Sequence, residues 1–373
     1  MQDKNVLFLV HRIFKDNIVK RGGADYITDF LISKGYSIIT IEHPLDGPHK
    51  TYIKTDKDTK AFSLIGKGPI RWIQEIIFNF INAPRTNVEL IISVDPLNFL
   101  SAYLIKLINR RKAKILFHSI DYSESRFGNT LLDSVYNSLY SFAVRNADVV
   151  TYVSEIMGGK IKEIIKLNAK TKNILFHLPN SPEFTKIPKV DISQKNKYSI
   201  VYSKSFISKE ELILLQNVIM RLKKDYPKII LHIVGNIDGI NGTTKTDLKR
   251  NLVIYGLIPY EKNIEIISNA YIGIGWYENK FSFEKYNDSL KLREYAASGI
   301  PAVCNDKTST AIEMEKEGAG IVTNTVAEIA SAISALLSDE KKYSEMHNNA
   351  IQWAKKNDKS KLLEQLLDKL NLC

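Results

Sequence analysis

The chain has 373 residues, 44% of them hydrophobic and 25% charged, which is typical of a folded globular protein and enough for two domains of ordinary size. Its two cysteines exclude a disulfide framework and fit a reducing compartment. The sequence contains no run of about 18 apolar residues and no basic leader with a cleavage site, so it predicts neither a membrane span nor a signal peptide.

The positive charge is unevenly distributed along the chain. The formal net charge is +11, and residues 1–180 contain 25 lysines and arginines against 17 aspartates and glutamates, a surplus of +8. A basic surface of this kind suits a phosphorylated substrate, an anionic lipid or a nucleic acid. Because the sequence has no DNA- or RNA-binding motif, we expect no nucleic-acid partner.

The first half of the chain alternates short apolar runs with amphipathic segments. The predicted strands are 5–10, 37–41, 61–65, 89–93, 114–118, 148–153 and 173–178. The predicted helices are 24–34, 69–82, 97–109, 128–146 and 155–167. Apolar strands that alternate with helices indicate a parallel sheet covered on both faces.

The second half repeats this pattern. The predicted strands are 198–203, 229–234, 252–255, 271–275, 301–303 and 320–322. The predicted helices are 208–225, 260–268, 289–298, 309–317, 326–338, 341–356 and 359–370.

We therefore predict an α/β protein with two doubly wound, Rossmann-like domains, at residues 1–183 and 198–355. A polar linker at 184–197 joins them, and a last helix within 356–373 is expected to pack back on the N-terminal domain. In such domains the ligand lies at the carboxyl ends of the strands.

Residues 289–303 are the most informative stretch. They run from Ser289 through a short helix to a Gly-Ile-Pro stop and a buried strand. Lys291 lies in the first turn of the helix, where the helix dipole and its charge both suit a phosphate. Glu294, three residues later, shares the same face and suits a donor such as a ribose hydroxyl. The pair therefore predicts a nucleoside diphosphate lying along this helix, although a solvated polar face would show the same spacing.

A glycine pair, Gly22 and Gly23, precedes the predicted helix 24–34. Glycines let the backbone approach a ligand closely, and the helix behind them offers N–H groups to an anion. A flexible turn followed by a helix cap would have the same sequence.

These segments together resemble the GT4 group of GT-B glycosyltransferases, in which the phrase K-L-x-E-Y-x-A-x-G-x-P-x-V recurs; here it spans residues 291–303. The resemblance implies a GT-B fold and a nucleotide-sugar donor bound by the C-terminal domain. It implies that Gly22 and Gly23 close over the donor diphosphate, and that Lys204 and Lys209 take the place of a diphosphate clamp. Donor-binding residues are thus expected at Gly22, Gly23, His118, Lys204, Lys209, Ser289, Lys291 and Glu294.

The resemblance also suggests catalytic and acceptor-side residues in the N-terminal domain. His118 would contact the donor sugar. Asp121, after the strand 114–118, and His11, after the first strand, are alternative candidates for a general base in an inverting reaction, and either could be an ordinary loop residue. Arg12 and Arg126 would lie on the acceptor side.

The chain departs from the group's pattern in two places. The group usually has a glycine and an arginine ahead of the clamp lysine, and this chain has lysines at 204 and 209 without either. Tyr286 stands where the group has the first glutamate of E-x7-E, which leaves the sugar and the stereochemistry open. These departures leave open a non-catalytic GT-B protein that binds another glycosyltransferase.

We expect no metal or other cofactor. The D-x-D of Asp56 and Asp58 lies in a charged run, not at the end of an inner strand, and no Cys/His cluster, P-loop or G-x-G-x-x-G motif occurs. In the GT-B group, lysines and helix dipoles neutralise the leaving diphosphate without a metal.

The expected acceptor is a glycan or a lipid-linked glycan of bacterial surface polysaccharide synthesis, in the cytoplasm. Residues 70–81 are unusually apolar for a surface helix, with Lys67 and Arg71 near its start. The helix is either buried on two sides or rests on the anionic inner face of the plasma membrane, where a lipid-linked acceptor would lie.

Overall fold

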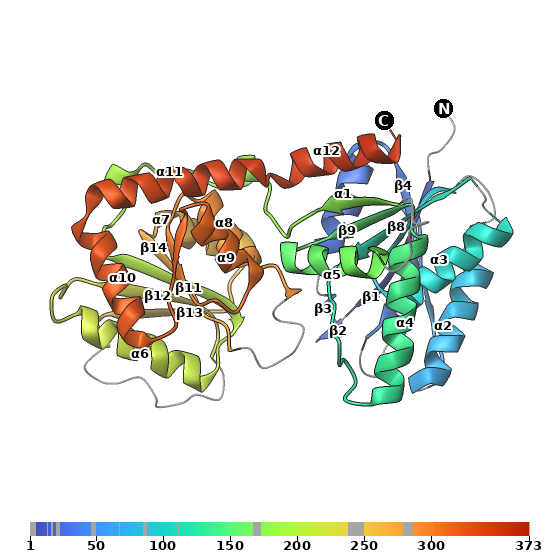
Figure 1. Ribbon diagram of the computed structural model, residues 1–373, viewed down its shortest axis with the longest axis horizontal. Helices are drawn as coiled ribbons and strands as arrows, with labels where there is room; N and C mark the ends of the chain where they lie inside the picture. The colour runs from blue at the N-terminus through green and yellow to red at the C-terminus, as the bar shows by residue number, and fades with distance from the viewer. Residues whose placement is uncertain are drawn as a thin grey trace. The chain divides into compact units, whose positions relative to one another are not determined.

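The computed structural model describes residues 5–12, 14–15, 18–19, 23–45, 50–66, 68–84, 88–109, 112–166, 173–237, 250–278 and 286–372. The chain divides into two compact units, which we call unit 1 (Met1–Leu178 and Leu362–Cys373) and unit 2 (Pro179–Lys361). Each unit is a sheet with helices packed on it (Figure 1). Within the described part of the chain, no helix is both long and apolar enough to cross a membrane.

Unit 1 is built on an eight-stranded sheet. Its strands are β1 (Asn5–Arg12), β4 (Ser37–Pro44), β5 (Thr51–Lys54), β6 (Thr59–Phe62), β7 (Val88–Ser93), β8 (Lys114–Ser119), β9 (Val149–Tyr152) and β10 (Ile174–His177), and a separate hairpin joins β2 (Phe14–Lys15) to β3 (Ile18–Val19). The order in the sheet is β10-β9-β8-β7-β1-β4-β5-β6. The apolar run of β1 explains its central place, because its two neighbours, β4 and β7, pair with it in parallel and both of its faces are covered.

The prediction of a purely parallel sheet was wrong at one edge of unit 1. β4, β5 and β6 pair antiparallel, and β5 was not predicted at all. β6 begins ahead of the predicted strand 61–65. These two strands are rich in threonine and lysine and are only partly buried, so they lack the apolar run by which a buried parallel strand is recognised.

The helices of unit 1 follow the expected alternation. They are α1 (Gly23–Ser33), α2 (Gly68–Asn82), α3 (Pro96–Asn109), α4 (Thr130–Asn146), α5 (Glu155–Lys166) and, from residue 362, α12 (Lys359–Leu370). α1 and α12 share one core with β1 and β7, in which Phe8, Leu31, Leu90 and Leu366 are buried. The C-terminal residues therefore pack on the unit that the N-terminal residues form, as Figure 1 shows for α1 and α12.

Unit 2 has a six-stranded, fully parallel sheet in the order β13-β12-β11-β14-β15-β16. The strands are β11 (Ser199–Phe206), β12 (Ile230–Asn236), β13 (Leu252–Gly256), β14 (Ile272–Gly275), β15 (Ala302–Cys304) and β16 (Gly320–Val322). The helices are α6 (Lys209–Leu222), α7 (Tyr260–Asn269), α8 (Leu290–Ala297), α9 (Ser309–Lys316), α10 (Val326–Ser338) and α11 (Glu340–Lys356).

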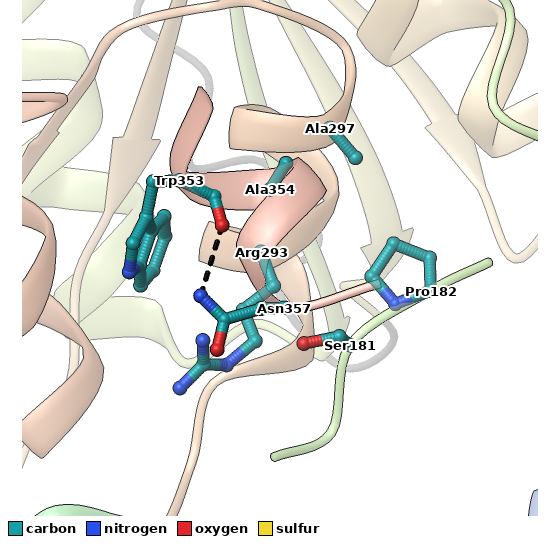
Figure 2. Close-up of a pocket in the computed structure, with 7 residues that line it drawn as sticks. All are labelled: Ser181, Pro182, Arg293, Ala297, Trp353, Ala354 and Asn357. Carbon is teal, nitrogen blue, oxygen red and sulfur yellow. Dashed lines mark hydrogen bonds between the residues drawn. The ribbon is translucent and has the colours of Figure 1, made fainter. Parts of the chain in front are cut away.

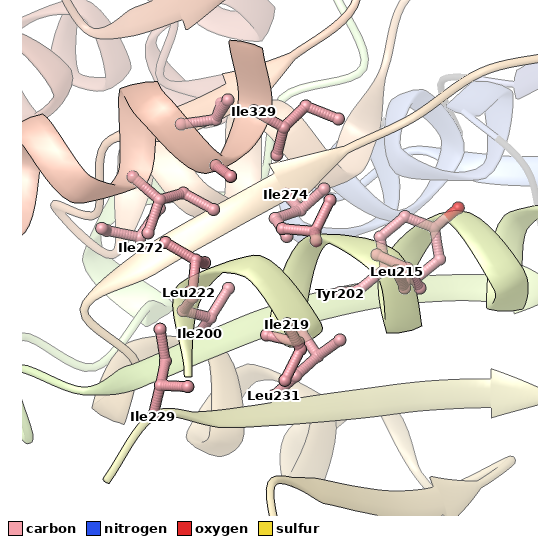
Figure 3. Close-up of a cluster of buried hydrophobic side chains, with 14 of the residues drawn as sticks. Ile200, Tyr202, Leu215, Ile219, Leu222, Ile229, Leu231, Ile272, Ile274 and Ile329 are labelled. Atoms are coloured by element: carbon pink, nitrogen blue, oxygen red, sulfur yellow. The ribbon is translucent and has the colours of Figure 1, made fainter. Parts of the chain in front are cut away.

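Two apolar clusters hold these helices against the two faces of the unit 2 sheet. In the first, α6 and α10 pack on β11, β12 and β14 through side chains such as Ile219, Leu231 and Ile329 (Figure 3). In the second, α7, α8, α9 and α11 pack through side chains such as Tyr295 and Met314. The sheet is thus covered on both faces, as expected of a parallel sheet.

The short helix α8 lies directly on β14 because β14 carries glycines where α8 crosses it. A Cβ at Gly273 would come within 2.4 Å of the Tyr295 ring, and a Cβ at Gly275 would come within 2.7 Å of a methyl group of Leu292. The hydroxyl of Tyr295 donates to the Ile274 carbonyl at 3.2 Å and accepts from the Ser203 N–H at 3.1 Å. These contacts hold α8 at the carboxyl ends of β11 and β14.

The boundary between the units lies ahead of the linker predicted at 184–197. The first unit ends at Leu178, and the predicted linker residues form two short 3₁₀ helices within unit 2, Phe184–Lys186 and Ile192–Gln194. Asn180 is held to unit 2 by its N–H, which donates to Asp288 at 2.6 Å.

Candidate functional site

The candidate donor site is the face of α8 that carries Lys291 and Glu294. Ser289 is the N-cap of this helix, and its hydroxyl accepts from the Leu292 N–H at 3.3 Å. Ser289 is itself buried, donates its N–H to Thr310 at 2.7 Å and bonds to the Tyr277 hydroxyl. Its described contacts are thus those of a residue that fixes the start of the helix.

Lys291 presents a buried Nζ on this face of α8. Its Nζ has no hydrogen-bond partner among the described residues. It lies 5.1 Å from the ring centroid of Tyr202 and 4.6 Å from that of Tyr277, so two aromatic faces are its nearest compensation. Burial, together with the charge of Lys204, lowers the pKa of Lys291 to about 7, although Glu211 and Glu294 oppose the shift. An anion at this position would satisfy the Nζ and restore its charge.

Glu294 is the complementary group on the same face. It is buried, and its Oε1 has no hydrogen-bond partner in the part of the chain that the structure describes. Burial raises the pKa of Glu294 to about 7, while a hydrogen bond from the Tyr260 hydroxyl and the charge of Lys291 act in the opposite direction. Tyr260, at the start of α7, thus holds the carboxylate and leaves an oxygen able to accept a hydroxyl donor.

The two lysines expected to clamp a diphosphate are placed differently from each other. Lys204, near the end of β11, forms an ion pair with the buried carboxylate of Glu211. That carboxylate also accepts from the Tyr202 hydroxyl at 2.9 Å and from the Ser208 N–H at 2.9 Å. Lys209 is exposed at the first turn of α6. Lys204 is therefore close to Lys291 but already paired, and Lys209 is open to solvent.

Gly235 explains how Lys204 comes to lie at this edge. Its φ is 146°, and a Cβ there would come within 1.8 Å of the Lys204 carbonyl oxygen, so the ends of β11 and β12 can approach only with glycine at this place.

A second polar cluster of unit 2 lies behind α8 and has a structural character. Asp288 accepts from Arg293 Nε at 2.8 Å and from Thr310 at 2.7 Å, and Arg293 also pairs with Glu313 at 3.0 Å. Arg293 borders a small pocket, whose lining is shown in Figure 2 and consists of Ser181, Pro182, Arg293, Ala297, Trp353, Ala354 and Asn357. This pocket includes neither Lys291 nor Glu294, so we do not assign it to the donor.

In unit 1, Asp121 and Arg126 are neighbours beyond the carboxyl end of β8. The Asp121 side chain is exposed. The protein around it nevertheless desolvates the carboxyl and raises its pKa, and the charge of Arg126 acts in the opposite direction. Arg126 lies over the Tyr136 ring at 5.3 Å, and its N–H donates to Asp133 at 2.7 Å. His118 is fully buried, and its Nδ1 is 2.7 Å from the Thr151 hydroxyl.

His11 is held between two carboxylates. Its Nδ1 is 2.8 Å from Asp95 Oδ2, and its Nε2 is 3.1 Å from Glu75 Oε2. Burial alone would lower the pKa of His11, but Asp95 and Glu75 outweigh it and raise the pKa to about 10. A general base must be unprotonated, so at neutral pH this geometry favours Asp121 over His11.

The remaining predicted residues of unit 1 lie around the end of β1. Arg12 is buried, and it donates from Nε to Glu42 at 2.7 Å and from Nη1 to Asp25 at 2.8 Å. Because its guanidinium is used inside the unit, a structural role is favoured over acceptor binding. α1 begins at Gly23, and Gly22 lies outside the described residues.

The helix α2 includes the apolar residues 70–81. Its polar residues Glu75 and Asn79 are buried and four of its isoleucines are exposed, so the alternative of a helix buried on two sides was wrong. Arg71 donates to Glu75 at 2.7 Å, so its guanidinium is used inside the unit and not left for lipid head groups. Lys67 lies outside the described residues.

Sequence reasoning missed four residues that define these two sites. Tyr260 and Glu211 set the environment of the α8 face, and Glu75 and Asp95 set that of His11. Glu211 has a local signal, because Ser208 and Glu211 form a capping box at the start of α6. The other three act across the fold, and no spacing in the sequence indicates their partners.

Comparisons with known proteins agree with this architecture. Residues 215–370 match the family model described as Glucosyltransferase 3-like, C-terminal domain. No curated protein sequence matches the chain significantly. Among solved structures, a glycosyltransferase from Rickettsia africae superposes with a TM-score of 0.68 at 14% identity, over 100% of this chain and 98% of that one.

Two further structures are similar over nearly their whole length. Sucrose-phosphate synthase from Thermosynechococcus elongatus has a TM-score of 0.66 at 12% identity, with 99% of this chain and 98% of that one covered. The Anabaena protein HepE, solved in complex with UDP-glucose, has a TM-score of 0.66 at 14% identity, with coverage of 99% and 100%. At these identities the similarity shows a shared fold, and the expected GT-B fold is confirmed.

The His11 cluster generates a pH-dependent prediction. The folded-state pKa of His11 is raised to about 10 from 6.5, so its stabilising contribution is complete below pH 6.5 and is lost as the pH rises toward 10. We expect His11→Asn to lower the melting temperature most near pH 6.5, and the gap from the wild type to narrow steadily up to pH 10. Thermal unfolding followed across this range measures the gap.

The matched control is His232→Asn in unit 2. Burial lowers the pKa of His232, so the folded state holds no extra proton there and its gap should not narrow as the pH rises toward 10. A gap for His11→Asn that is equally large at pH 6.5 and pH 10 would show that His11 is not a cation held by the two carboxylates.

Proposed function

We propose that the chain, which has the GT-B fold, is a glycosyltransferase that transfers a sugar from a nucleoside-diphosphate donor to a glycan or lipid-linked glycan acceptor. In this proposal the donor binds unit 2 along α8, and the acceptor binds unit 1 near Asp121 and Arg126. The reaction belongs to the synthesis of bacterial surface polysaccharide or glycoconjugate, in the cytoplasm at the inner face of the plasma membrane.

The observation that carries the donor assignment is the pair of unsatisfied buried atoms on α8. Among described residues, neither Lys291 Nζ nor Glu294 Oε1 has a hydrogen-bond partner, and they differ in charge. Leaving such groups unpaired costs free energy, which a ligand with an anion and a hydroxyl at matching positions would recover. A diphosphate supplies the anion and the ribose next to it supplies the hydroxyl. The Anabaena protein of the same fold was solved with UDP-glucose, which makes UDP-glucose the first donor to test.

We propose that the leaving diphosphate is neutralised by protein groups, with no metal required. Lys291 lies in the first turn of α8, so its charge and the N-terminal end of the helix dipole would act on the same phosphate. Lys204 would join them by leaving Glu211, and Lys209 lies at the N-terminal end of α6.

For the acceptor, we propose that Asp121 takes the proton from the attacking hydroxyl if the enzyme inverts. Desolvation raises the pKa of its carboxyl above the ordinary value, which strengthens it as a base. Arg126, whose charge acts on Asp121, would help to hold the acceptor. A retaining reaction would not need this base.

The donor assignment predicts selective effects on nucleotide binding. Glu294→Ala should weaken UDP binding about 10- to 100-fold, the worth of a hydrogen bond to a charged group. Lys291→Met should weaken the binding of UDP far more than that of uridine, because the ammonium acts on the diphosphate. Isothermal titration gives both affinities, and release of nucleotide from UDP-, GDP- and dTDP-sugars identifies the donor.

The matched control is Lys262→Met, which removes an exposed lysine of α7 that pairs with Glu265 on the surface. It should leave both affinities unchanged. If folded Lys291→Met loses UDP and uridine affinity equally, the lysine has a structural role and the assignment fails. If UDP binds but no nucleotide sugar is turned over with any acceptor, the chain is a non-catalytic GT-B protein.

The base assignment is tested by Asp121→Asn. With an identified acceptor, this variant should lose ~10²–10⁴ in kcat, the usual contribution of a general base, with little change in donor affinity. Steady-state kinetics measure the loss, and NMR of the product gives its anomeric configuration. A fully active Asp121→Asn enzyme that inverts would exclude Asp121 as the base.

A further inference from the structure

The start of α6 already holds an anion that belongs to the protein, the carboxylate of Glu211. This residue is buried, with 1% of its surface exposed. Its Oε2 accepts from the Ser208 N–H at 2.9 Å, and its Oε1 accepts from the Tyr202 hydroxyl at 2.9 Å and from Lys204 Nζ. A backbone N–H at a helix start, a hydroxyl and a lysine are also the groups that bind phosphate oxygens. Glu211 therefore occupies a set of donors that suits a phosphate equally well.

The same carboxylate lies close to Lys291. The Tyr202 ring, whose hydroxyl Glu211 holds, is centred 5.1 Å from Lys291 Nζ. The charges of both Lys204 and Glu211 act on Lys291, in opposite directions. The two lysines that the proposed function places at the diphosphate thus lie near one buried carboxylate, and of the two only Lys204 is paired with it.

Lys204 is able to exchange this partner for another anion. Its side chain is 28% exposed and that of Glu211 only 1%, so the lysine is the member of the pair that solvent reaches. Without Lys204, the carboxylate keeps the Ser208 N–H and the Tyr202 hydroxyl as donors. Breaking the pair still costs free energy, because a buried carboxylate loses its cation. A phosphate that binds Lys204 must offset that cost.

We propose that Glu211 is a positioning residue that competes with the donor diphosphate for Lys204 and thereby limits the affinity of the site for nucleoside diphosphates. The proposal rests on the proposed function, in which the diphosphate lies along α8. When a diphosphate binds, Lys204 exchanges the Glu211 carboxylate for a phosphate oxygen. When the nucleoside diphosphate leaves, Lys204 returns to Glu211, and this ready partner makes the release of the product easier.

The alternative is that Glu211 serves only the helix, as the third residue of the capping box at the start of α6. Glutamine separates the two roles, because it also suits this capping position and its carbonyl oxygen can accept from the Ser208 N–H. Its amide would then donate to the Tyr202 hydroxyl, which can in turn donate to the Trp276 carbonyl, 3.5 Å away. Glu211→Gln therefore removes the charge and keeps the cap.

The test is a calorimetric titration of UDP and of uridine into the wild type and Glu211→Gln. The variant should bind UDP about fivefold more tightly, the upper end of the contribution of a partly exposed ion pair, because Lys204 is released. Its affinity for uridine and its melting temperature should equal those of the wild type, since uridine carries no phosphate and the cap is kept.

A double-mutant cycle with Lys204→Met shows whether the effect passes through Lys204. The loss of UDP affinity caused by Lys204→Met should be larger in the Glu211→Gln background, where no carboxylate competes for the lysine. In the wild-type background, Lys204→Met should cost less UDP affinity than Lys291→Met, because Lys204 gives up an existing partner when it binds a phosphate.

The matched control is Glu210→Gln, which removes the same charge from an exposed side chain in the same turn of α6. It should leave the affinity for UDP close to that of the wild type.

Unchanged or weaker UDP binding by folded Glu211→Gln would overturn the proposal and leave the donor assignment standing. Equal tightening of UDP and uridine would also overturn it. Additive effects of Glu211→Gln and Lys204→Met would do the same, because they would show that the ion pair stays intact when UDP binds. If the wild type binds UDP no more tightly than uridine, the donor assignment fails, and this proposal fails with it.

Discussion

The α8 site depends on one buried amino group, Lys291 Nζ, to which no described residue makes a hydrogen bond. Lys291 Nζ is enclosed by the rings of Tyr202 and Tyr277 at 5.1 and 4.6 Å, and among the described residues no acceptor bonds to it. The glycines of β14 bring α8 against the sheet, which is what buries the lysine. Leaving such a group without a partner costs free energy, which an anion bound there, as in the proposed function, would recover.

The polar cluster of unit 1 shows the opposite arrangement. His11 is a buried cation, but Asp95 and Glu75 compensate it fully, and the bonds of Glu75 and Arg71 fix the direction of α2. A fully paired cation gains little from a further anion, whereas Lys291, whose pKa burial lowers to about 7, regains its charge when an anion binds beside it. The His11 cluster is thus architectural, and the proposed function gives the binding role to the α8 site.

Much of this could be predicted from the sequence, and the failures have physical causes. The short helix with Lys291 and Glu294 follows from local periodicity and a Gly-Ile-Pro stop, so it was found. The edge strands β5 and β6 were missed or misplaced because their polar residues carry no apolar run. The sequence showed that residues 70–81 are unusually apolar but could not say which side of α2 faces inward, because that depends on bonds to His11 and His43 from distant segments.

The most direct test is a titration of UDP into the protein at pH 8, in two buffers with different enthalpies of ionisation. Burial lowers the pKa of Lys291 to about 7, so the free site is mostly unprotonated at pH 8, and a bound diphosphate should raise that pKa. The account predicts uptake of up to about one proton per UDP, seen as a difference in binding enthalpy between the buffers, and its disappearance in Lys291→Met. Equal enthalpies for the wild type in both buffers, with UDP bound, would contradict it.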